Sequence, residues 1–466
     1  MVQNATSSPP SLHERQMASE NIRGLLLRYS IPPMIGMFVN ALYNVVDRFW
    51  VGRIPGVGRD ALAGIGLVLP VMNALLGVSM LLGIGAATTI SIRLGQGDRA
   101  GAEHILGNTL ALVAILGSGI TALGLLFAEP ILIALGADAN ILPHALPYYR
   151  ITVAGYIFWI ATLAMNHPIR AVGNTKRFAT AHLIGGICNM ILDPIFILTF
   201  GWGIRGAAFA TVVSQILAAC WVFSYYFSDK STLKIRREYL KPVKKIVLAV
   251  FAIGVSPFLM QSVGSFVIII ANHSLKFYGD IELSDGNIAI SVMAVILGVS
   301  MMFFMPLFGI NQGSQPIIGY NYGAGNFDRV KEAYKWSMIY SAVICAIGFI
   351  VTQFFSVPLV SAFNDDPEFV AVGSLGMRIF MSCVILIGLQ IPSINFFQSV
   401  GRAKMAIALS MLRQVIILIP LYLLLPRFFG LTGIWFAAPI SDALACVVTL
   451  YFIFTEFKRL DKNIRS

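Results

Sequence analysis

Long apolar stretches separated by short polar connectors dominate the pattern along the chain. Twelve of these stretches are long enough to cross a bilayer core about 30 Å thick, which takes about 20 helical residues. They begin near Ile31, Ala61, Ile105, Leu146, Phe178, Ala207, Ile246, Ile288, Ala333, Ser374, Met405 and Gly433, and those near Leu146 and Ser374 are the least regular. The pattern predicts an all-α integral membrane protein with twelve transmembrane helices.

Composition narrows the class of protein further. Of the 466 residues, 57% are apolar and 12% are charged, whereas a soluble domain has about 45–50% apolar and about 25% charged residues. Too few polar side chains remain to cover a water-facing surface of this size. The composition therefore argues against soluble enzymes and nucleic-acid-binding modules. The net charge of +11 does not indicate a nucleic-acid partner, because the basic residues lie in the short connectors.

The distribution of basic residues predicts the orientation in the membrane. Lys and Arg number 24 in the two terminal segments and the even-numbered connectors, and eight on the opposite side. The positive-inside rule then places both termini in the cytoplasm. The organisation we expect is a cytoplasmic tail over 1–29, an N-lobe of six spans over 30–227, a basic cytoplasmic linker over 228–245, a C-lobe of six spans over 246–457, and a cytoplasmic tail over 458–466.

The two halves of the chain resemble each other at a nearly fixed offset of 228 positions. Gly85, Gly95 and Gly97 recur as Gly313, Gly323 and Gly325. The segment 171–176 recurs as 399–404, and with one deletion 203–206 matches 430–433. Because each half has an even number of spans, the halves share one orientation, as in parallel repeats about an axis normal to the bilayer. This predicts two six-helix lobes related by pseudo-two-fold symmetry, an arrangement that suits alternating access. A duplicated structural bundle without a transport role is the alternative.

Polar side chains inside the spans gather in the first half. Ionisable groups in hydrocarbon are costly and usually face an aqueous cavity or the bundle interior. Spacings of four and seven residues place the polar residues of one span on one helical face. The residues are Asn40, Asn44 and Asp47 in the first span, Asn166 in the fourth, Asn189 and Asp193 in the fifth, and Thr211 in the sixth.

Two carboxylates among neutral oxygen donors have a specific chemistry. Hard monovalent cations prefer oxygen ligands. Without a cation, Asp47 and Asp193 would repel each other, so a proton could take the place of the ion. We therefore expect one site that exchanges Na⁺ and H⁺, and no other metal site or cofactor. The alternative is that neutral hydrogen bonds hold both carboxyl groups for packing alone.

The second half of the chain carries a different pair. Arg413 in the eleventh span and Asp442 in the twelfth lie within one or two helical turns in depth, counted at about 1.5 Å per residue. A structural ion pair is favoured over a role facing substrate. No Walker-A, HExxH or GxSxG motif occurs, so the sequence predicts no nucleotide hydrolysis by that route and no enzyme.

Three stretches identify a family resemblance: Asn44-Val-Val-Asp47-Arg-Phe-Trp-Val-Gly52, Asn189-Met-Ile-Leu-Asp193-Pro-Ile-Phe196 and Gln315-Pro-Ile-Ile-Gly-Tyr-Asn-Tyr-Gly323. With them the chain resembles the multidrug and toxic compound extrusion (MATE) family from about Ser30 to Phe457, and the last two resemble its DinF-like branch. The resemblance implies two six-helix lobes in a V, and export of organic, often cationic amphiphilic compounds against inward Na⁺ or H⁺.

The resemblance also implies roles for individual residues. The family's N-lobe cation site matches Asp47, Asn189, Asp193 and Thr211, with Asn166 close by, and its first-helix proline, where the helix bends, matches Pro32. The carboxylates that the NorM-like branch has in its C-lobe are missing, and Gln261 is the nearest polar residue in the seventh span. Candidates to line the cavity are therefore Asn40, Asn44, Asn166 and Gln261.

The function expected from sequence is thus secondary active multidrug efflux by antiport. The expected setting is a multi-pass monomer in a bacterial inner (plasma) membrane, with drug-like small molecules and the lipid bilayer as partners. A lipid-linked saccharide flippase of the related fold is the nearest alternative, but such a protein would need several basic residues in its cavity. The spans here offer chiefly Arg413. A channel or a membrane-embedded enzyme is a weaker alternative from another class.

Overall fold

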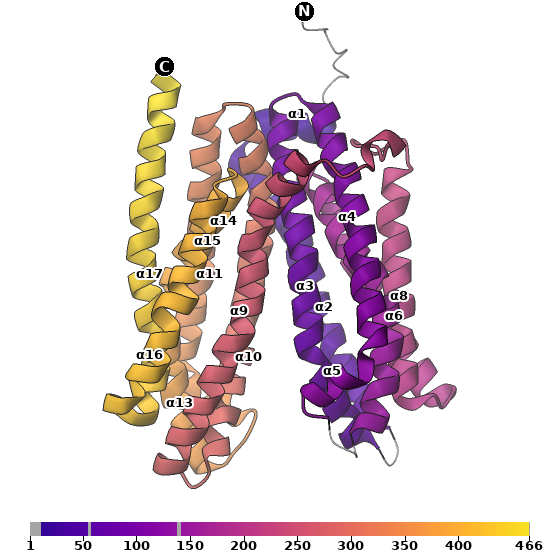
Figure 1. The fold of residues 1–466 in the computed structure, drawn as a ribbon. Helices are drawn as coiled ribbons and strands as arrows, with labels where there is room; N and C mark the ends of the chain where they lie inside the picture. The colour runs from indigo at the N-terminus through magenta and orange to yellow at the C-terminus, as the bar shows by residue number, and fades with distance from the viewer. Residues whose placement is uncertain (1–10, 55–56, 138–140, 466) are drawn as a thin grey trace, which may run out of the picture. The chain divides into compact units, whose positions relative to one another are not determined.

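A computed structural model describes residues 11–54, 57–137 and 141–465 (Figure 1). Within these ranges the chain is helical and contains no β-strand. The α-helices are α1 (Leu12–Ser19), α2 (Ile22–Gly52), α3 (Gly58–Gly95), α4 (Arg99–Leu126), α5 (Ala128–Ala134), α6 (Leu142–Ala171), α7 (Thr175–Pro194), α8 (Gly203–Tyr226), α9 (Lys244–Glu282), α10 (Gly286–Gly323), α11 (Phe327–Phe354), α12 (Ser356–Ser361), α13 (Pro367–Phe380), α14 (Val384–Ser399), α15 (Ala403–Met411), α16 (Ile419–Leu424) and α17 (Pro426–Arg465). The other helical segments are the π-helices η1 (Ile195–Thr199) and η3 (Leu412–Leu418) and the 3₁₀ turn η2 (Arg237–Tyr239).

The chain divides into two compact units. Of the described residues, the first unit holds those in 11–20, 31–258 and 319–325, and the second holds those in 21–30, 259–318 and 326–465. The lobe boundaries expected from sequence stay a prediction.

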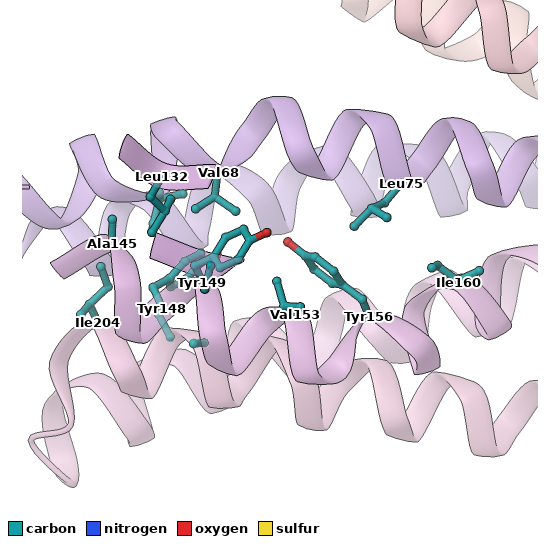
Figure 2. Close-up of a cluster of buried hydrophobic side chains, with 14 of the residues drawn as sticks. Val68, Leu75, Leu132, Ala145, Tyr148, Tyr149, Val153, Tyr156, Ile160 and Ile204 are labelled. Carbon is teal, nitrogen blue, oxygen red and sulfur yellow. The ribbon is translucent and has the colours of Figure 1, made fainter. Parts of the chain in front are cut away.

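Packing in the first unit centres on α6, which lies against α3, α4 and α8, while α7 packs on α8. Its core is a cluster of buried side chains between these helices (Figure 2). Tyr149 and Tyr156 lie two turns apart on α6, and their hydroxyl groups point toward each other in Figure 2. Apolar side chains such as Val68 and Leu75 of α3 complete the cluster. This packing fixes α6, beside which the polar residues of α7 and α8 lie.

In the second unit, α14 packs against α11 and α17, and α17 also contacts α13, η3 and α16. Trp435 and Ile434 on α17 are buried in its core together with Tyr422 of α16. Asp442, two turns beyond Trp435 on α17, therefore lies on a helix that is held on several sides.

Ten helices in the described part of the chain are long and apolar enough to cross a membrane, and an eleventh span results if α13 and α14, bent by 47°, count as one. Helix α6 has 30 residues but falls outside this set, since it is less apolar. The two irregular runs of the sequence, near Leu146 and Ser374, correspond to α6 and to the bent pair. Large apolar side chains such as Phe38, Phe266 and Val447 are exposed on the long helices, where hydrocarbon is their natural solvent.

The helices begin earlier than the apolar runs that predicted them. Helix α2 begins at Ile22 rather than near Ile31, and α4 begins at Arg99 rather than near Ile105. Polar capping explains the difference at α4, since the Asp98 carboxylate accepts a hydrogen bond of 2.8 Å from the Gly101 amide. The segment expected to be a tail also contains α1, where Met17 is fully buried and Ser11 and Glu14 form a capping box. Hydropathy marks only the part of a helix that lies in lipid.

The internal repeat is visible in the backbone at the glycines that end or begin helices. Gly97 and Gly325 have φ angles of 77° and 75°, Gly173 and Gly401 have 87° and 75°, and Gly203 and Gly430 have 54° and 55°. Positive φ is readily adopted only by glycine. Each pair keeps the sequence offset of 228, or 227 after the deletion. Both halves therefore use the same left-handed turns at the same places.

Candidate functional site: a carboxylate pair beside a cavity

The carboxyl groups of Asp47 on α2 and Asp193 on α7 lie side by side in the first unit, close enough to interact directly. Asp193 has no exposed surface, and Asp47 is partly buried. Sequence spacing within each span placed these two residues on polar faces, and packing of α2 near α7 brings the faces together. The result is two acidic groups in the interior of a membrane-spanning bundle.

Asn189 connects this pair to α8. Its Nδ2 atom donates to Asp193 Oδ1 at 3.3 Å and lies 3.4 Å from Thr211 Oγ1. Thr211 in turn donates to the Ala207 carbonyl at 3.0 Å, so its hydroxyl is fixed by its own helix. The four predicted residues Asp47, Asn189, Asp193 and Thr211 thus form one cluster from three helices.

Several oxygen atoms of the cluster have no hydrogen-bond partner in the described part of the chain. These buried atoms are Asp47 Oδ1, Asn189 Oδ1 and Asp193 Oδ2. Leaving such atoms unsatisfied costs free energy, more for a charged group than for a neutral one. A hard cation would coordinate several of them at once, and a proton on one carboxyl group would supply one hydrogen-bond donor. The residues present therefore fit a monovalent cation or a proton.

A cavity of about 60 Å³ adjoins the cluster within the first unit. It exceeds the space needed for a single water molecule. Its walls come from α2, α6, α7 and α8 and combine apolar with hydrogen-bonding surface. The lining residues are Asn40, Tyr43, Trp159, Thr162, Leu163, Ala181, His182, Gly185, Gly186, Asn189, Thr211, Ser214, Gln215 and Ala218.

Not every predicted lining residue reaches this cavity. Asn40 lines it, but Asn44 is exposed and donates from Nδ2 to the Asn40 carbonyl at 2.7 Å. At 100° per residue, Asn44 lies about 60° around the helix from Asp47, which turns it away. Asn166 is buried and donates to the Phe178 carbonyl at 2.9 Å, which ties α6 to α7. The structure therefore assigns Asn44 and Asn166 other contacts.

Two further predicted residues lie elsewhere. Gln261 is a partly buried residue of α9 in the second unit, whereas the carboxylate pair belongs to the first. Pro32 lies inside α2 next to Pro33. A proline in a helix removes one backbone hydrogen bond and favours a kink, so a bend at Pro32 stays a prediction.

Sequence reasoning missed several residues of the site. Tyr43 of α2 and Tyr148 of α6 lie within electrostatic reach of both carboxyl groups. His182 and Gln215 line the cavity. Gln215 follows Thr211 by one helical turn in an otherwise apolar span, which is a signal that could have found it. Tyr43 and Tyr148 carry no such signal, because tyrosine is common in membrane helices.

The C-lobe candidates meet in the second unit. Arg413 Nε lies 2.6 Å from Asp442 Oδ1, and the Ser441 hydroxyl donates to the Arg413 carbonyl at 2.8 Å. Arg413 belongs to the π-helical segment η3. Since Asp442 neutralises it, Arg413 does not offer the free positive charge that a flippase for an acidic lipid headgroup would need.

Fold and site together define an all-helical membrane transporter with an acidic centre in one unit. The family model described as MatE matches residues 32–195 and 276–424, and the chain belongs to this family. It is a transporter and not an enzyme. Assignment to the DinF-like branch stays a prediction.

Similar proteins extend over nearly the whole chain. "Multidrug export protein MepA" of Staphylococcus aureus (strain MSSA476) is 26% identical over 435 residues, which cover 93% of this chain and 94% of that protein. MepA of Staphylococcus haemolyticus (strain JCSC1435) is 25% identical over the same shares.

Solved structures share the fold. An outward-facing multidrug resistance MATE family transporter of the MOP superfamily superposes with a TM-score of 0.90 at 23% identity, covering 98% of this chain and 100% of that one. A MOP superfamily transporter from Pyrococcus furiosus Vc1 (DSM3638), described as having reverse polarity of its binding pocket, gives a TM-score of 0.89 at 23% identity, covering 97% of this chain and 100% of that one. These matches confirm the predicted all-α membrane fold with two six-helix lobes.

Proposed function

We propose that the protein exports small organic compounds, often cationic and amphiphilic, in exchange for inward Na⁺ or H⁺. The observation that carries the proposal is the pair Asp47 and Asp193, which has buried oxygen atoms without hydrogen-bond partners and lies beside a cavity in a membrane-spanning bundle. The similarity to proteins named multidrug export protein supports the substrate class.

The coupling follows from charge. An entering cation or proton offsets one negative charge of the carboxylate pair, and Asn189 and Thr211 supply neutral oxygen atoms from α7 and α8. An organic cation near the same carboxylates competes with the coupling ion for their negative charge. Alternating access then links release of the organic cation to binding of the coupling ion. Each ligand shifts the equilibrium between the inward-open and outward-open states by its difference in affinity for them.

The setting we propose is a bacterial inner membrane, with both termini cytoplasmic and a monomer as the working form. The support is the basic count of 24 against eight on the two sides of the predicted topology. Inward flow of the coupling ion then follows the usual ion gradients, and substrate leaves the cell.

Efflux from proteoliposomes tests the proposal, with a Na⁺ gradient and a H⁺ gradient imposed separately. The variants Asp47→Asn and Asp193→Asn keep size and hydrogen bonding but remove the charge. We expect each to lower gradient-driven efflux to the rate of protein-free liposomes, with folded protein retained. Wild-type rates in both variants would refute the assignment.

A matched control is Asp365→Asn, since Asp365 is an exposed residue between α12 and α13. It should transport like the wild type. Glu103 is unsuitable as a control, because it is buried and bound to Arg236 at 2.6 Å. Which of the two gradients drives wild-type efflux identifies the coupling ion.

A further inference from the structure

The second unit contains a buried ion pair that the coupling proposal does not use. Asp442 is 2% exposed and contacts Arg413 from η3, while Cys345, Tyr422 and Cys446 lie within electrostatic reach of its carboxylate. A buried charge without its partner is strongly destabilising. The π-helical turn at Arg413 is itself unusual, since π-helices are rare and are frequently found at functional sites.

The repeat relates this pair to the first unit. Segment 399–404 corresponds to 171–176 at an offset of 228, and 430–433 corresponds to 203–206 at 227. Matched positive-φ glycines, Gly173 with Gly401 and Gly203 with Gly430, anchor both alignments in the backbone. Arg413 then corresponds to Gly185 or, if the deletion precedes it, to Gly186. Asp442 corresponds to Gln215.

All of these first-unit positions line the cavity. Gly185, Gly186 and Gln215 are wall residues, and Gln215 Oε1 is buried without a hydrogen-bond partner in the described chain. A Cβ atom added at Gly185 would meet only Ala218, at 3.7 Å, whereas one at Gly186 would press on Val39 at 3.0 Å, so α7 leaves room on the Gly185 side. In the second unit the corresponding position carries a guanidinium group, and the corresponding amide is replaced by the carboxylate that binds it.

A third position follows the same pattern. Thr162 lines the cavity of the first unit, and its hydroxyl lies 3.4 Å from the Gln215 carbonyl. Its counterpart is Gln390 of α14, which is 1% exposed, and neither atom of its amide group has a partner within the described residues. The second unit therefore retains hydrogen-bonding groups at positions that line a cavity in the first.

We infer that the Arg413 side chain is a built-in cation at the place in the second unit that corresponds to the cavity wall of the first unit, with Asp442 as its ligand. The guanidinium group fills the position that the repeat leaves open in the first unit. Without the Arg413 side chain, the site would take a small planar organic cation of the guanidinium class, because a carboxylate binds that geometry well. It follows that coupling ions exchange in the first unit alone, and this one consequence rests on the proposed function.

Chemical rescue tests the inference without measuring transport. The full-length variant Arg413→Ala is purified, and its thermal unfolding is followed while methylguanidinium chloride is added at millimolar concentrations. We expect the variant to unfold several degrees below the wild type, and methylguanidinium to raise its Tm saturably. A ligand that binds only the folded state must stabilise it. Choline chloride at equal concentration controls for ionic strength, since its bulky cation does not match the vacated space.

Removing the Asp442 carboxylate as well separates specific binding of methylguanidinium from general effects of the salt. Arg413→Ala with Asp442→Asn should show no saturable rise, and neither should the wild type. An equal rise in the double variant, or none in Arg413→Ala, would overturn the inference. Where Arg413→Ala yields no folded protein, the double variant should recover folded yield, because it leaves no unpaired buried charge. An equal loss of folded yield in both variants overturns the inference. These readouts do not depend on Asp47 or Asp193, so failure here is distinct from failure of the coupling proposal.

Discussion

The four side chains around the carboxylate pair differ in what they can offer a bound cation. Asp47 and Asp193 supply charge, whereas Asn189 and Thr211 supply neutral oxygen atoms. Thr211 is also held by the Ala207 carbonyl, so its hydroxyl is oriented before any ion arrives. A neutral hydrogen bond contributes about 0.5–1.5 kcal/mol and one to a charged group about 1.5–3 kcal/mol. The effects of substitution should therefore be graded.

At this scale we predict that Asn189→Ala and Thr211→Ala slow gradient-driven efflux by roughly 2- to 10-fold, the range that one neutral hydrogen bond supports. Asn189→Ala should cost more, since Asn189 contacts both Asp193 and Thr211. Initial efflux rates at several ion concentrations measure the effect. Thr455→Ala is the matched control, because Thr455 is exposed and bonds to its own helix in the same way. Losses as complete as those of Asp47→Asn would contradict a neutral role.

Sequence predicted the charged centre of the site better than its walls. Asp47, Asn189, Asp193 and Thr211 stand out because polar groups are rare in membrane spans, and the structure gathers all four. Tyr43, Trp159 and His182 line the cavity but resemble ordinary span residues along the chain. Asn44 shared a polar face with Asp47 by spacing, yet a rotation of about 60° suffices to expose it. Residue spacing predicts which side chains share a helical face, and the packing of neighbouring helices decides which of them reach the site.

Helices α3 and α10 cross closely near their C-terminal ends within the first unit. A Cβ atom added at Gly95 would overlap the carbonyl oxygen of Tyr320, and one at Gly323 would overlap that of Ile92. Gly95 and Gly323 are repeat-related. The two helices therefore approach backbone to backbone, as small residues allow in membrane proteins.

We predict that Gly95→Ala and Gly323→Ala each lower the stability of the protein by about 1–3 kcal/mol, the usual cost of overpacking. Thermal unfolding in detergent should show the loss as a lower Tm. Gly119→Ala on α4 is the control, because no atom lies within 4 Å of a Cβ there, and it should be neutral or stabilising since alanine favours helix. An unchanged Tm in Gly95→Ala would show that the crossing is loose.

The connector between the halves is also held in place. Asn108 of α4, fully buried, donates to the carbonyls of Tyr239 and Lys241 at 2.9 and 3.2 Å and accepts from the Val243 amide at 2.6 Å. The Glu103 carboxylate binds Arg236. The basic segment that hydropathy predicts as a plain linker is thus docked on α4.

We expect Asn108→Ala to release this segment, because one substitution removes all three contacts. Trypsin, which cuts after Lys and Arg, should then cleave the linker several-fold faster, as judged by the appearance of two half-length fragments. Asn287→Ala changes an exposed asparagine of the second unit and should leave the cleavage rate unchanged. Equal rates in Asn108→Ala and wild type would show that the Asn108 contacts do not hold the linker.

Hydropathy recovered the long helices but not their details. Lipid-facing runs mark α3, α9 and α10 clearly, whereas the caps that extend α2 and α4 depend on local hydrogen bonds. The break between α13 and α14 and the π-helical turns η1 and η3 could not be predicted. A π turn needs only one additional residue in a helix, and its position is set by neighbouring helices rather than by a sequence signal.

For the molecule as a whole, the internal repeat links the two units by sequence while their chemistry differs. Both halves use glycine at the same turns, so the backbone was predictable from the offset of 228. The polar side chains could not be predicted from that offset, because the first unit has an acidic cluster beside a cavity and the second unit has a neutralised ion pair. The whole-molecule property that sequence does address directly is orientation, through the basic residues.

The last prediction is therefore the topology. Lys234 is exposed on the linker, and Asp365 is exposed between α12 and α13, on the side with few basic residues. Cysteine at each position reports its side through reaction with a membrane-impermeant maleimide. The exposed native Cys220 is first changed to Ala so that it does not react. In intact cells Asp365→Cys should be labelled and Lys234→Cys should not, whereas inside-out vesicles should reverse the result. Labelling of Lys234→Cys from outside intact cells would invert the orientation and, with it, the direction of transport that we propose.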